Sequence, residues 1–327
     1  MRGLLLDGGA VFRDDLPDPV AGVDEAIVRI LRAGVCNTDL ELARGYMGFR
    51  GVPGHEFVGI VEASSDPSWG GARVVGEINA GCGTCADCLA GDARHCAGRT
   101  VLGIVGRNGT FAERIALPLR NLRRVPDGLS TALAIFTEPL AAAFAITEHL
   151  HVRPVDRVTV LGDGKLGLLV AQVLAGTGCD LELVGKHEGK LDIVARRGIP
   201  TAFLTEWTER VRRGGRMAQR DVVVDATGSA AGFELARAAV RPRGTLVLKT
   251  TCADKLHLDT APIVVDEIRV IGSRCGPFEP ALRALAAGIV DVAPLQDRAF
   301  PFEEAAEALA YAARGGVLKT SIEVAPE

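Results

Sequence analysis

The chain has 327 residues, of which 48% are hydrophobic and 24% are charged, with a formal net charge of −4. This length exceeds one ordinary core, so we expect two domains, and the weak acidity argues against proteins that bind nucleic acids or membrane surfaces through clustered positive charge. The sequence shows neither the ~18 consecutive apolar residues of a membrane helix nor a signal peptide, which predicts a cytoplasmic protein.

The first third of the chain is expected to form a compact, mostly β domain. Runs of β-forming residues at Glu25–Leu31 and Phe57–Glu62 are separated by turn signals such as Gly70-Gly71 and Asn108-Gly109. The long segments between these signals predict functional loops.

Three polar residues are candidate ligands of a metal ion. Cys36 stands in Gly-Val-Cys-Asn-Thr-Asp, His55 in Gly-His-Glu, and Glu138 in the apolar stretch Leu133–Ile146. Burying such a carboxylate is costly unless it meets a cation or a donor. A mixed sulfur, nitrogen and oxygen set with one open position is typical of catalytic zinc. Spacing alone does not pair these residues, and each by itself is more often an ordinary buried side chain.

Four of the eight cysteines are closely spaced. They are Cys82, Cys85, Cys88 and Cys96. Four thiolates at these spacings can surround a tetrahedral ion at ~2.3 Å per bond, and a complete set leaves no open position. We therefore predict a structural zinc; the alternative is a group of unrelated buried thiols. No role is assigned to Cys179, Cys252 and Cys275, since single cysteines usually act as small buried hydrophobes.

From about Val155 onward, strands alternate with helices. We expect strands at Arg157–Leu161, Asp180–Val184, Asp221–Asp225, Thr245–Lys249 and Ile268–Ile271, and helices at Lys165–Ala175, Lys190–Arg197 and Phe233–Val240. Apolar strands in this alternation predict a doubly wound parallel sheet with helices on both faces. The tail Ala293–Val324 has no sheet of its own and is expected to join the first domain.

A glycine-rich turn follows the first strand of this second region. Gly162-Asp-Gly164-Lys165-Leu166-Gly167 comes directly after Val158–Leu161 and before an apolar helix, as a dinucleotide-binding turn requires. Gly162 permits the tight turn, Gly164 lets the backbone approach a pyrophosphate, and Gly167 allows close helix–strand packing. The helix N-terminus then attracts the phosphate charge.

Taken together and in this order, these motifs resemble the zinc-containing medium-chain dehydrogenase/reductase family. The resemblance covers essentially the whole chain. It implies a Rossmann α/β fold, a doubly wound parallel sheet over residues 149–288, and a mostly β GroES-like catalytic domain over residues 1–148 and 289–327. Because Glu138 stands where the alcohol dehydrogenases carry a cysteine, the chain is nearest to the sorbitol, threonine and glucose dehydrogenase branch.

The resemblance also assigns roles around a catalytic zinc. It implies that Cys36, His55 and Glu138 bind the ion, and that Glu56 lies beside it and can exchange with water as a ligand. Thr38 matches a hydroxyl that relays the released proton. Glu41, where many relatives have a histidine, is either the terminal proton acceptor or an ordinary surface residue.

The same alignment with the family locates the cofactor-selecting position. It falls on Gly185, followed by Lys186 and His187, where NAD enzymes carry an acid that binds the ribose hydroxyls. A missing carboxylate and a nearby cation predict NADP(H) rather than NAD(H); the alternative is a solvated Lys186 in a permissive NAD enzyme. Thr227 is expected to line the cofactor site, and Lys319 to reach the pyrophosphate.

These features predict a zinc-dependent dehydrogenase with two zinc ions per chain that moves a hydride between NADP(H) and an alcohol, polyol or sugar hydroxyl. Two alternatives are a zinc-free-type enone or quinone reductase and a non-catalytic NADP-binding protein with a structural zinc. The family resemblance implies a homodimer or homotetramer, and no nucleic-acid or membrane partner is expected.

Overall fold

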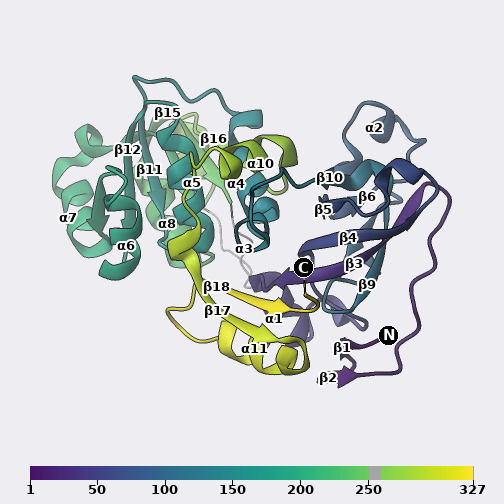
Figure 1. The fold of residues 1–327 in the computed structure, drawn as a ribbon. Coiled ribbons are helices and arrows are strands. Elements are labelled where there is room, and N and C mark those ends of the chain that lie inside the picture. The colour runs from purple at the N-terminus through teal and green to yellow at the C-terminus, as the bar shows by residue number, and fades with distance from the viewer. Residues whose placement is uncertain (250–258, 327) are drawn as a thin grey trace. The chain divides into compact units, whose positions relative to one another are not determined.

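A mixed sheet and a parallel sheet organise two separate units in this computed structural model, which describes residues 1–249 and 259–326 (Figure 1). Unit 1 comprises Met1–Glu138 and Phe278–Glu327, and unit 2 comprises Pro139–Pro277. The domain limits proposed from the sequence, 148/149 and 288/289, lie further along the chain than these divisions.

The mixed sheet of unit 1 is built around β3. Its strands are β3 (Glu25–Gly34), β4 (Glu56–Ser64), β5 (Arg73–Gly76), β9 (Arg114–Pro118), β10 (Leu122–Arg124), β17 (Gln296–Pro301) and β18 (Lys319–Glu323). They run in the order β10-β5-β4-β3-β18-β17, with β9 also paired to β3. Along β3, the fully buried Ala26, Val28 and Ile30 alternate with half-buried residues, the period of two that strands impose.

Short elements surround this sheet. They are the paired strands β1 (Gly3–Leu6) and β2 (Ala10–Arg13), the strands β6 (Asn79–Ala80), β7 (Thr100–Leu102) and β8 (Gly106–Arg107), and the helices α1 (Asn37–Ala43), α2 (Ala86–Leu89), α3 (Thr131–Ala134), α10 (Phe278–Ala286) and α11 (Ala305–Ala312). The loop between β6 and β7 contains α2 and carries the closely spaced cysteines. A further helix, α4 (Thr137–His149), begins at the end of unit 1.

Unit 2 confirms the predicted doubly wound sheet. Its strands are β11 (Arg157–Leu161), β12 (Asp180–Gly185), β13 (Thr201–Phe203), β14 (Arg220–Asp225), β15 (Val240–Leu248) and β16 (Arg269–Gly272). They are parallel and run in the order β13-β12-β11-β14-β15-β16. The order reverses between β11 and β14, and ligands of such sheets bind outside the carboxyl ends of the strands at that point.

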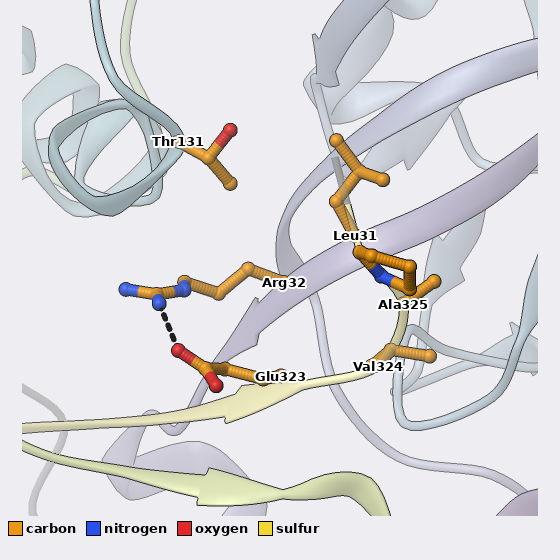
Figure 2. Close-up of a pocket in the computed structure, with 7 residues that line it drawn as sticks. Leu31, Arg32, Thr131, Glu323, Val324 and Ala325 are labelled. Atoms are coloured by element: carbon orange, nitrogen blue, oxygen red, sulfur yellow. Dashed lines mark hydrogen bonds and ion pairs between the residues drawn. The ribbon is translucent and has the colours of Figure 1, made fainter.

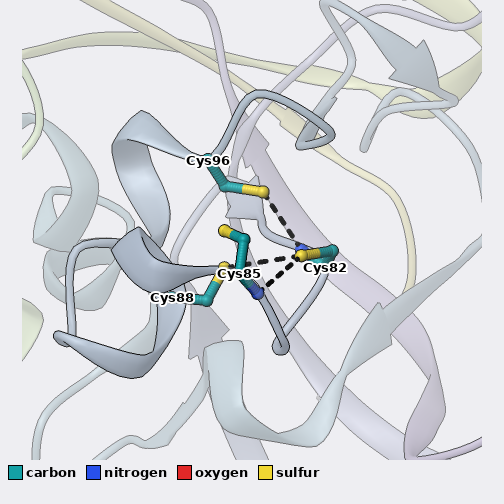
Figure 3. A group of neighbouring side chains, drawn as sticks. All are labelled: Cys82, Cys85, Cys88 and Cys96. Carbon is teal, nitrogen blue, oxygen red and sulfur yellow. Dashed lines mark hydrogen bonds between the residues drawn. The ribbon is translucent and has the colours of Figure 1, made fainter.

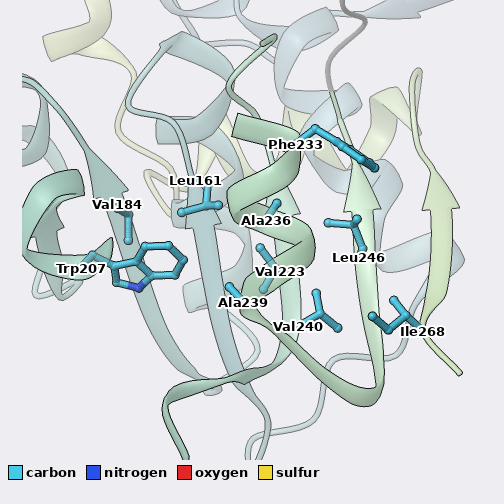
Figure 4. Close-up of a cluster of buried hydrophobic side chains, with 10 residues drawn as sticks. All are labelled: Leu161, Val184, Trp207, Val223, Phe233, Ala236, Ala239, Val240, Leu246 and Ile268. Atoms are coloured by element: carbon cyan, nitrogen blue, oxygen red, sulfur yellow. The ribbon is translucent and has the colours of Figure 1, made fainter. Parts of the chain in front are cut away.

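The helices of unit 2 pack apolar side chains onto this sheet. They are α5 (Lys165–Ala175), α6 (Glu188–Ala195), α7 (Leu204–Gly214), α8 (Ala230–Ala239) and α9 (Ala261–Val265). Figure 4 shows one buried cluster that extends across the strands from Trp207 of α7, past Leu161, to Leu246 and Ile268. Among residues 1–249 and 259–326, no helix combines the length and apolar character needed to span a membrane.

Candidate functional site

A thiol, an imidazole and a carboxylate converge in unit 1. The ligand atoms of Cys36, His55 and Glu56 all lie within 4.8 Å of one another. Cys36 lies between the end of β3 and α1, whereas His55 and Glu56 lie at the start of β4. Because β3 and β4 are antiparallel neighbours, with Gly34 opposite Glu56, the end of one strand meets the beginning of the other. The sheet register therefore assembles this group from two distant sequence motifs.

Asp39, on the first turn of α1, fixes the orientation of this group. Its Oδ1 lies 3.1 Å from Nδ1 of His55 and accepts the N–H of Gly54 at 3.1 Å, while its Oδ2 accepts the N–H of Cys36 at 2.8 Å. The Asp39 side chain is fully buried. Since a carboxylate only accepts, Nδ1 of His55 carries the proton and Nε2 remains for a metal ion. The sequence motif contained Asp39, but its spacing gave no indication of this role.

Glu56 is buried, and the surroundings of its two carboxylate oxygens differ. Its Oε2 forms an ion pair with Nζ of Lys319, which is also buried. Its Oε1 has no hydrogen-bond partner among the described residues. A Cβ on Gly34 would come within 2.2 Å of Oε2, so Gly34 leaves room for this carboxylate. A buried acceptor without a partner is costly, and a cation beside Cys36 and His55 would satisfy it.

Glu138 belongs to the same electrostatic environment but not to the compact group. Its carboxylate is not within 4.8 Å of all three ligand atoms described above. Burial raises the pKa of Glu138 to about 7, with His55 opposing the rise and Glu56 adding to it. The pKa of His55 lies well above its ordinary value, since Asp39 and Cys36 outweigh the lowering caused by burial. A bound cation would replace the protons that these groups otherwise hold.

The two residues expected to move the proton lie on or beside α1. The hydroxyl of Thr38 is 3.9 Å from Sγ of Cys36, which places it at the edge of the ligand group. Glu41 is half-exposed and forms an ion pair with Arg44 at 2.7 Å. A direct contact between Glu41 and the ligand group is not observed in the described part of the chain.

Lys319 lies in an unexpected environment. Beyond Glu56, its ammonium group approaches the carbonyl oxygen of Val35 at 3.5 Å and lies 5.8 Å from the centre of the Phe136 ring. Burial lowers the pKa of Lys319, but Glu56 and Cys36 raise it above its ordinary value. Its predicted contact with a pyrophosphate stays a prediction, whereas its contact with Glu56 was not foreseen from the sequence.

The four clustered cysteines form a second group in unit 1. The sulfur atoms of Cys82, Cys85, Cys88 and Cys96 lie within 4.8 Å of one another and face a common point (Figure 3). Backbone N–H groups donate to these sulfurs, including Thr84 to Cys82 at 3.5 Å and Cys82 to Cys96 at 3.4 Å. Such donors stabilise thiolates, and the thiolate is the form that binds a metal.

The pKa values of two of these thiols shift in opposite directions. Hydrogen bonds from Thr84 and from the N–H of Cys85 lower the pKa of Cys82 to about 5, whereas the pKa of Cys85 rises to about 11. A Cβ on Gly81 would lie 2.7 Å from Sγ of Cys88, so this loop closes only around glycine. The donors and their spacing fit a closed tetrahedral zinc site. Cys179 and Cys275 lie elsewhere and are half-buried, and Cys252 lies outside the described residues.

The glycine turn of unit 2 has the geometry that a dinucleotide requires. Gly162 has a φ of +113°, and a Cβ there would lie 2.7 Å from the carbonyl oxygen of Ala226. A Cβ on Gly167 would lie 1.9 Å from the carbonyl oxygen of Gly162. Gly164 caps α5, whose first turn contains Lys165 and Leu166. Backbone N–H groups at this helix start are suited to bind phosphate.

Asp163 joins this turn to the end of β12. Its Oδ2 accepts the N–H groups of Lys186 and His187, both at 2.7 Å, and lies 3.0 Å from Nδ1 of His187. Burial raises the pKa of Asp163, but these hydrogen bonds outweigh it and hold the pKa below its ordinary value. Asp163 therefore places a carboxylate at the end of β12, beside Gly185, which has no side chain of its own.

Thr227 follows β14 at the same carboxyl edge. Its hydroxyl donates to Oδ1 of Asp225 at 2.7 Å, and its N–H donates to the same oxygen at 2.9 Å. The side chain is thereby fixed at an exposed position.

A shallow hollow of about 400 Å³ lies elsewhere in unit 1, between β3, α3 and the chain end (Figure 2). Its charged members, Arg32 and Glu323, pair with each other. It contains none of the candidate ligands, so we assign it no catalytic role.

Comparisons with known proteins agree with both units. The sequence profile of the family "Alcohol dehydrogenase GroES-like domain" matches residues 22–127, and that of the family "Zinc-binding dehydrogenase" matches residues 166–287. L-threonine 3-dehydrogenase of Streptomyces coelicolor is 31% identical, over 92% of this chain and 93% of that protein. D-arabitol-phosphate dehydrogenase of Enterococcus avium is 27% identical, over 96% and 94%. A crystal structure described as a zinc-binding dehydrogenase from Sinorhizobium meliloti 1021, bound to NADP, superimposes with a TM-score of 0.88 at 26% identity and covers 99% of both chains.

Proposed function

Because this chain belongs to the zinc-containing medium-chain dehydrogenase/reductase family, near its sorbitol and threonine dehydrogenase branch, we propose that it oxidises a secondary alcohol, polyol or sugar hydroxyl with NADP⁺ and reduces the corresponding carbonyl with NADPH. One observation carries the proposal. The ligand atoms of Cys36, His55 and Glu56 lie together, and one oxygen of this Glu56 carboxylate has no hydrogen-bond partner among the described residues.

Two zinc ions per chain are part of the proposal. The closed set of cysteines in the loop between β6 and β7 would hold a structural ion. Cys36, His55 and Glu138 would hold the catalytic ion, with Glu56 as the carboxylate that exchanges with water. A zinc ion there would supply Lewis acidity, which favours loss of the hydroxyl proton from the substrate. Asp39 contributes by holding His55 in the tautomer that leaves Nε2 available.

The residues of α1 would conduct the released proton. Thr38 stands beside Cys36 and carries a hydroxyl that can accept one proton and donate another. Glu41, half-exposed on the same helix, is proposed as the acceptor that meets solvent. If Glu41→Gln leaves the pH–rate profile unchanged, Glu41 has only a surface role.

NADP(H) is the proposed dinucleotide. When bound, it would supply the hydride acceptor for oxidation of an alcohol and the hydride donor for the reverse reaction. The glycine turn would hold the pyrophosphate, with Thr227 as a further contact. The contact predicted for Lys319 is not part of this proposal, because its ammonium group is buried against Glu56 in unit 1. Lys186 is exposed and His187 is 54% exposed in its side chain, so both side chains are available as donors to a 2′-phosphate. No acidic side chain at position 185 opposes them.

The proposed substrate class is tested with purified, zinc-replete protein. Polyols, aldoses and secondary alcohols are supplied with NADP⁺ or NAD⁺, and formation of reduced nicotinamide is followed by its absorbance. We expect turnover of at least one polyol or sugar and a kcat/KM for NADP⁺ at least ~10-fold above that for NAD⁺, about 1.4 kcal/mol of differential binding. A tenfold or larger preference for NAD⁺ would overturn the choice of cofactor, and absence of turnover across the panel would overturn the substrate class.

We also propose a cytoplasmic homodimer or homotetramer. Thiols that serve as metal ligands fit a reducing compartment, and the family forms such oligomers. Light scattering of the protein as it leaves a size-exclusion column measures its molar mass, which gives the number of subunits.

A further inference from the structure

We propose that Asp163 is the positioning residue through which this enzyme prefers the 2′-phosphorylated dinucleotide, because it fixes Lys186 and His187 at the carboxyl end of β12. The inference rests on the proposed use of NADP(H). It adds a residue of the glycine turn, Asp163, to the group that selects between the two dinucleotides.

The first observation is that several hydrogen-bonding groups meet at one carboxylate oxygen of Asp163. Oδ2 of Asp163 accepts two consecutive backbone N–H groups, those of Lys186 and His187, and also faces the imidazole of His187. Asp163 is itself 7% exposed, so these bonds lie in a poorly solvated place. A carboxylate bonded in this way constrains both the backbone path and one ring.

The second observation is the space around Gly185. A Cβ at this position would lie 2.5 Å from both Cβ and Oδ2 of Asp163. Any side chain on residue 185 would therefore collide with Asp163. The place from which an acid at the end of β12 would extend is already filled by a side chain from the neighbouring loop.

The third observation is the direction in which the side chains of Asp163, Lys186 and His187 face. The carboxylate of Asp163 is directed toward N–H donors, which compensate its charge at close range. Because Nδ1 of His187 faces Asp163, Nε2 is the nitrogen left for another partner. Lys186 is exposed beside it. Asp163 thus holds the ring of His187 and the backbone of Lys186 in place, and a donor held in place binds a phosphate with less loss of entropy than a mobile one.

Calorimetry with two cofactor fragments tests the proposal on the full, zinc-replete chain. The probes are 2′,5′-ADP, which carries one phosphate on O2′ and one on O5′, and 5′-AMP, which lacks only the 2′-phosphate. We expect the wild type to bind 2′,5′-ADP at least ~10-fold more tightly than 5′-AMP. Asp163→Asn is expected to reduce this ratio by a factor of about 3–10, mainly through weaker binding of 2′,5′-ADP. A purely structural loss would weaken both fragments alike and leave the ratio unchanged.

Two further variants keep the test decisive if Asp163→Asn folds poorly. Gly185→Ala presses on the carboxylate from the other side and is expected to lower the same ratio. In the double variant Lys186→Ala/His187→Ala, adding Asp163→Asn is expected to change the ratio no further, because the residues through which it acts are gone. Asp192→Asn, an exposed acid on α6, is the matched control and is expected to leave both affinities at the wild-type value.

The outcomes separate this inference from the proposed function. If the wild type prefers 2′,5′-ADP and Asp163→Asn and Gly185→Ala keep that preference, only the role of Asp163 is refuted. If the wild type prefers 5′-AMP and Asp163→Asn abolishes that preference, the carboxylate binds the ribose itself, and both this inference and the choice of NADP(H) fail. If neither fragment binds, the dinucleotide site fails as a whole.

Discussion

Asp39 is the residue on which the geometry of the metal-ligand group most depends. It holds the backbone at Cys36 and Gly54 as well as the ring of His55, and it is fully buried. Removing its charge would release a ligand ring and two backbone segments together. Carboxylates that orient metal-bound histidines are known to affect metal affinity strongly.

We therefore expect Asp39→Asn to weaken zinc binding at the catalytic position by about 10–100-fold. The affinity is measured by competition with a chelator, with Asp15→Asn as the control because Asp15 is exposed and paired with Arg13. Equal zinc affinity in the two variants would show that His55 does not need Asp39.

Gly34 provides a second test at the residue scale. A Cβ on Gly34 would displace the Glu56 carboxylate from its ion pair with Lys319. We expect Gly34→Ala to lower the free energy of unfolding by about 1–3 kcal/mol, as overpacked cores do. Urea denaturation measures this, and Gly98→Ala, where no atom lies within 4 Å of the added Cβ, is expected to change little. An unchanged midpoint for Gly34→Ala would mean that Glu56 is free to move.

The sequence identified individual residues better than their partners. Cys36, His55 and Glu56 stand out because they occupy short motifs, and the structure brings their ligand atoms together. The contacts of Asp39 with His55 and of Asp163 with residues 185–187 join separate elements. Such contacts are set by strand register and loop path, which local spacing does not encode.

At the scale of elements, α7 and β13 show where local patterns fail. The strands β11 and β14 and the second half of β15 contain apolar runs, and the sequence identified them. The first half of β15, which contains Arg241, Pro242 and Arg243, was not expected as a strand. The helix α7 has the sequence LTEWTERVRRG, in which Leu204, Trp207 and Val211 lie on one face among charged residues. Only Trp207 is buried, and this helix was not among those expected from the sequence. The strand β13 has three residues and no distinctive pattern.

Trp207 is accordingly the anchor of α7. It lies in one cluster with Leu161 and Val184, at 1% exposure. We expect Trp207→Ala to cost about 3–5 kcal/mol, as large core truncations do. Amide hydrogen exchange is expected to show faster exchange in β11 and β12, whereas Phe203→Ala, at a position 38% exposed, leaves these strands protected. Unchanged protection in Trp207→Ala would mean that α7 is not needed to cover the sheet.

The loop between β6 and β7 is the element whose structure we propose to depend on a metal. We expect Cys88→Ser to lose one zinc ion per chain and to increase hydrogen exchange across the loop between β6 and β7, because a structural zinc stabilises its loop directly. Metal analysis and exchange measure the two effects, and Cys179→Ser, outside this group, is the control. Full zinc content in Cys88→Ser would contradict a site formed by four thiolates.

At the scale of the whole molecule, each unit carries one part of the proposed chemistry. Unit 1 contains both groups of candidate ligands, and unit 2 contains the glycine turn and the residues around Asp163. The parallel sheet and the mostly β domain were predictable because periodicity and glycine spacing report on each segment separately. The place where one unit ends was less predictable, since α4 continues through the division after Glu138.

The most direct test of the account is to measure zinc content and catalysed alcohol oxidation together in Cys36→Ser. The account predicts that this variant retains the ion of the cysteine loop, loses the second ion and its turnover, and still binds 2′,5′-ADP, because the dinucleotide site lies in unit 2. A Cys36→Ser variant that turns over substrate at the wild-type rate, or a wild-type chain that binds only one zinc ion, would contradict it.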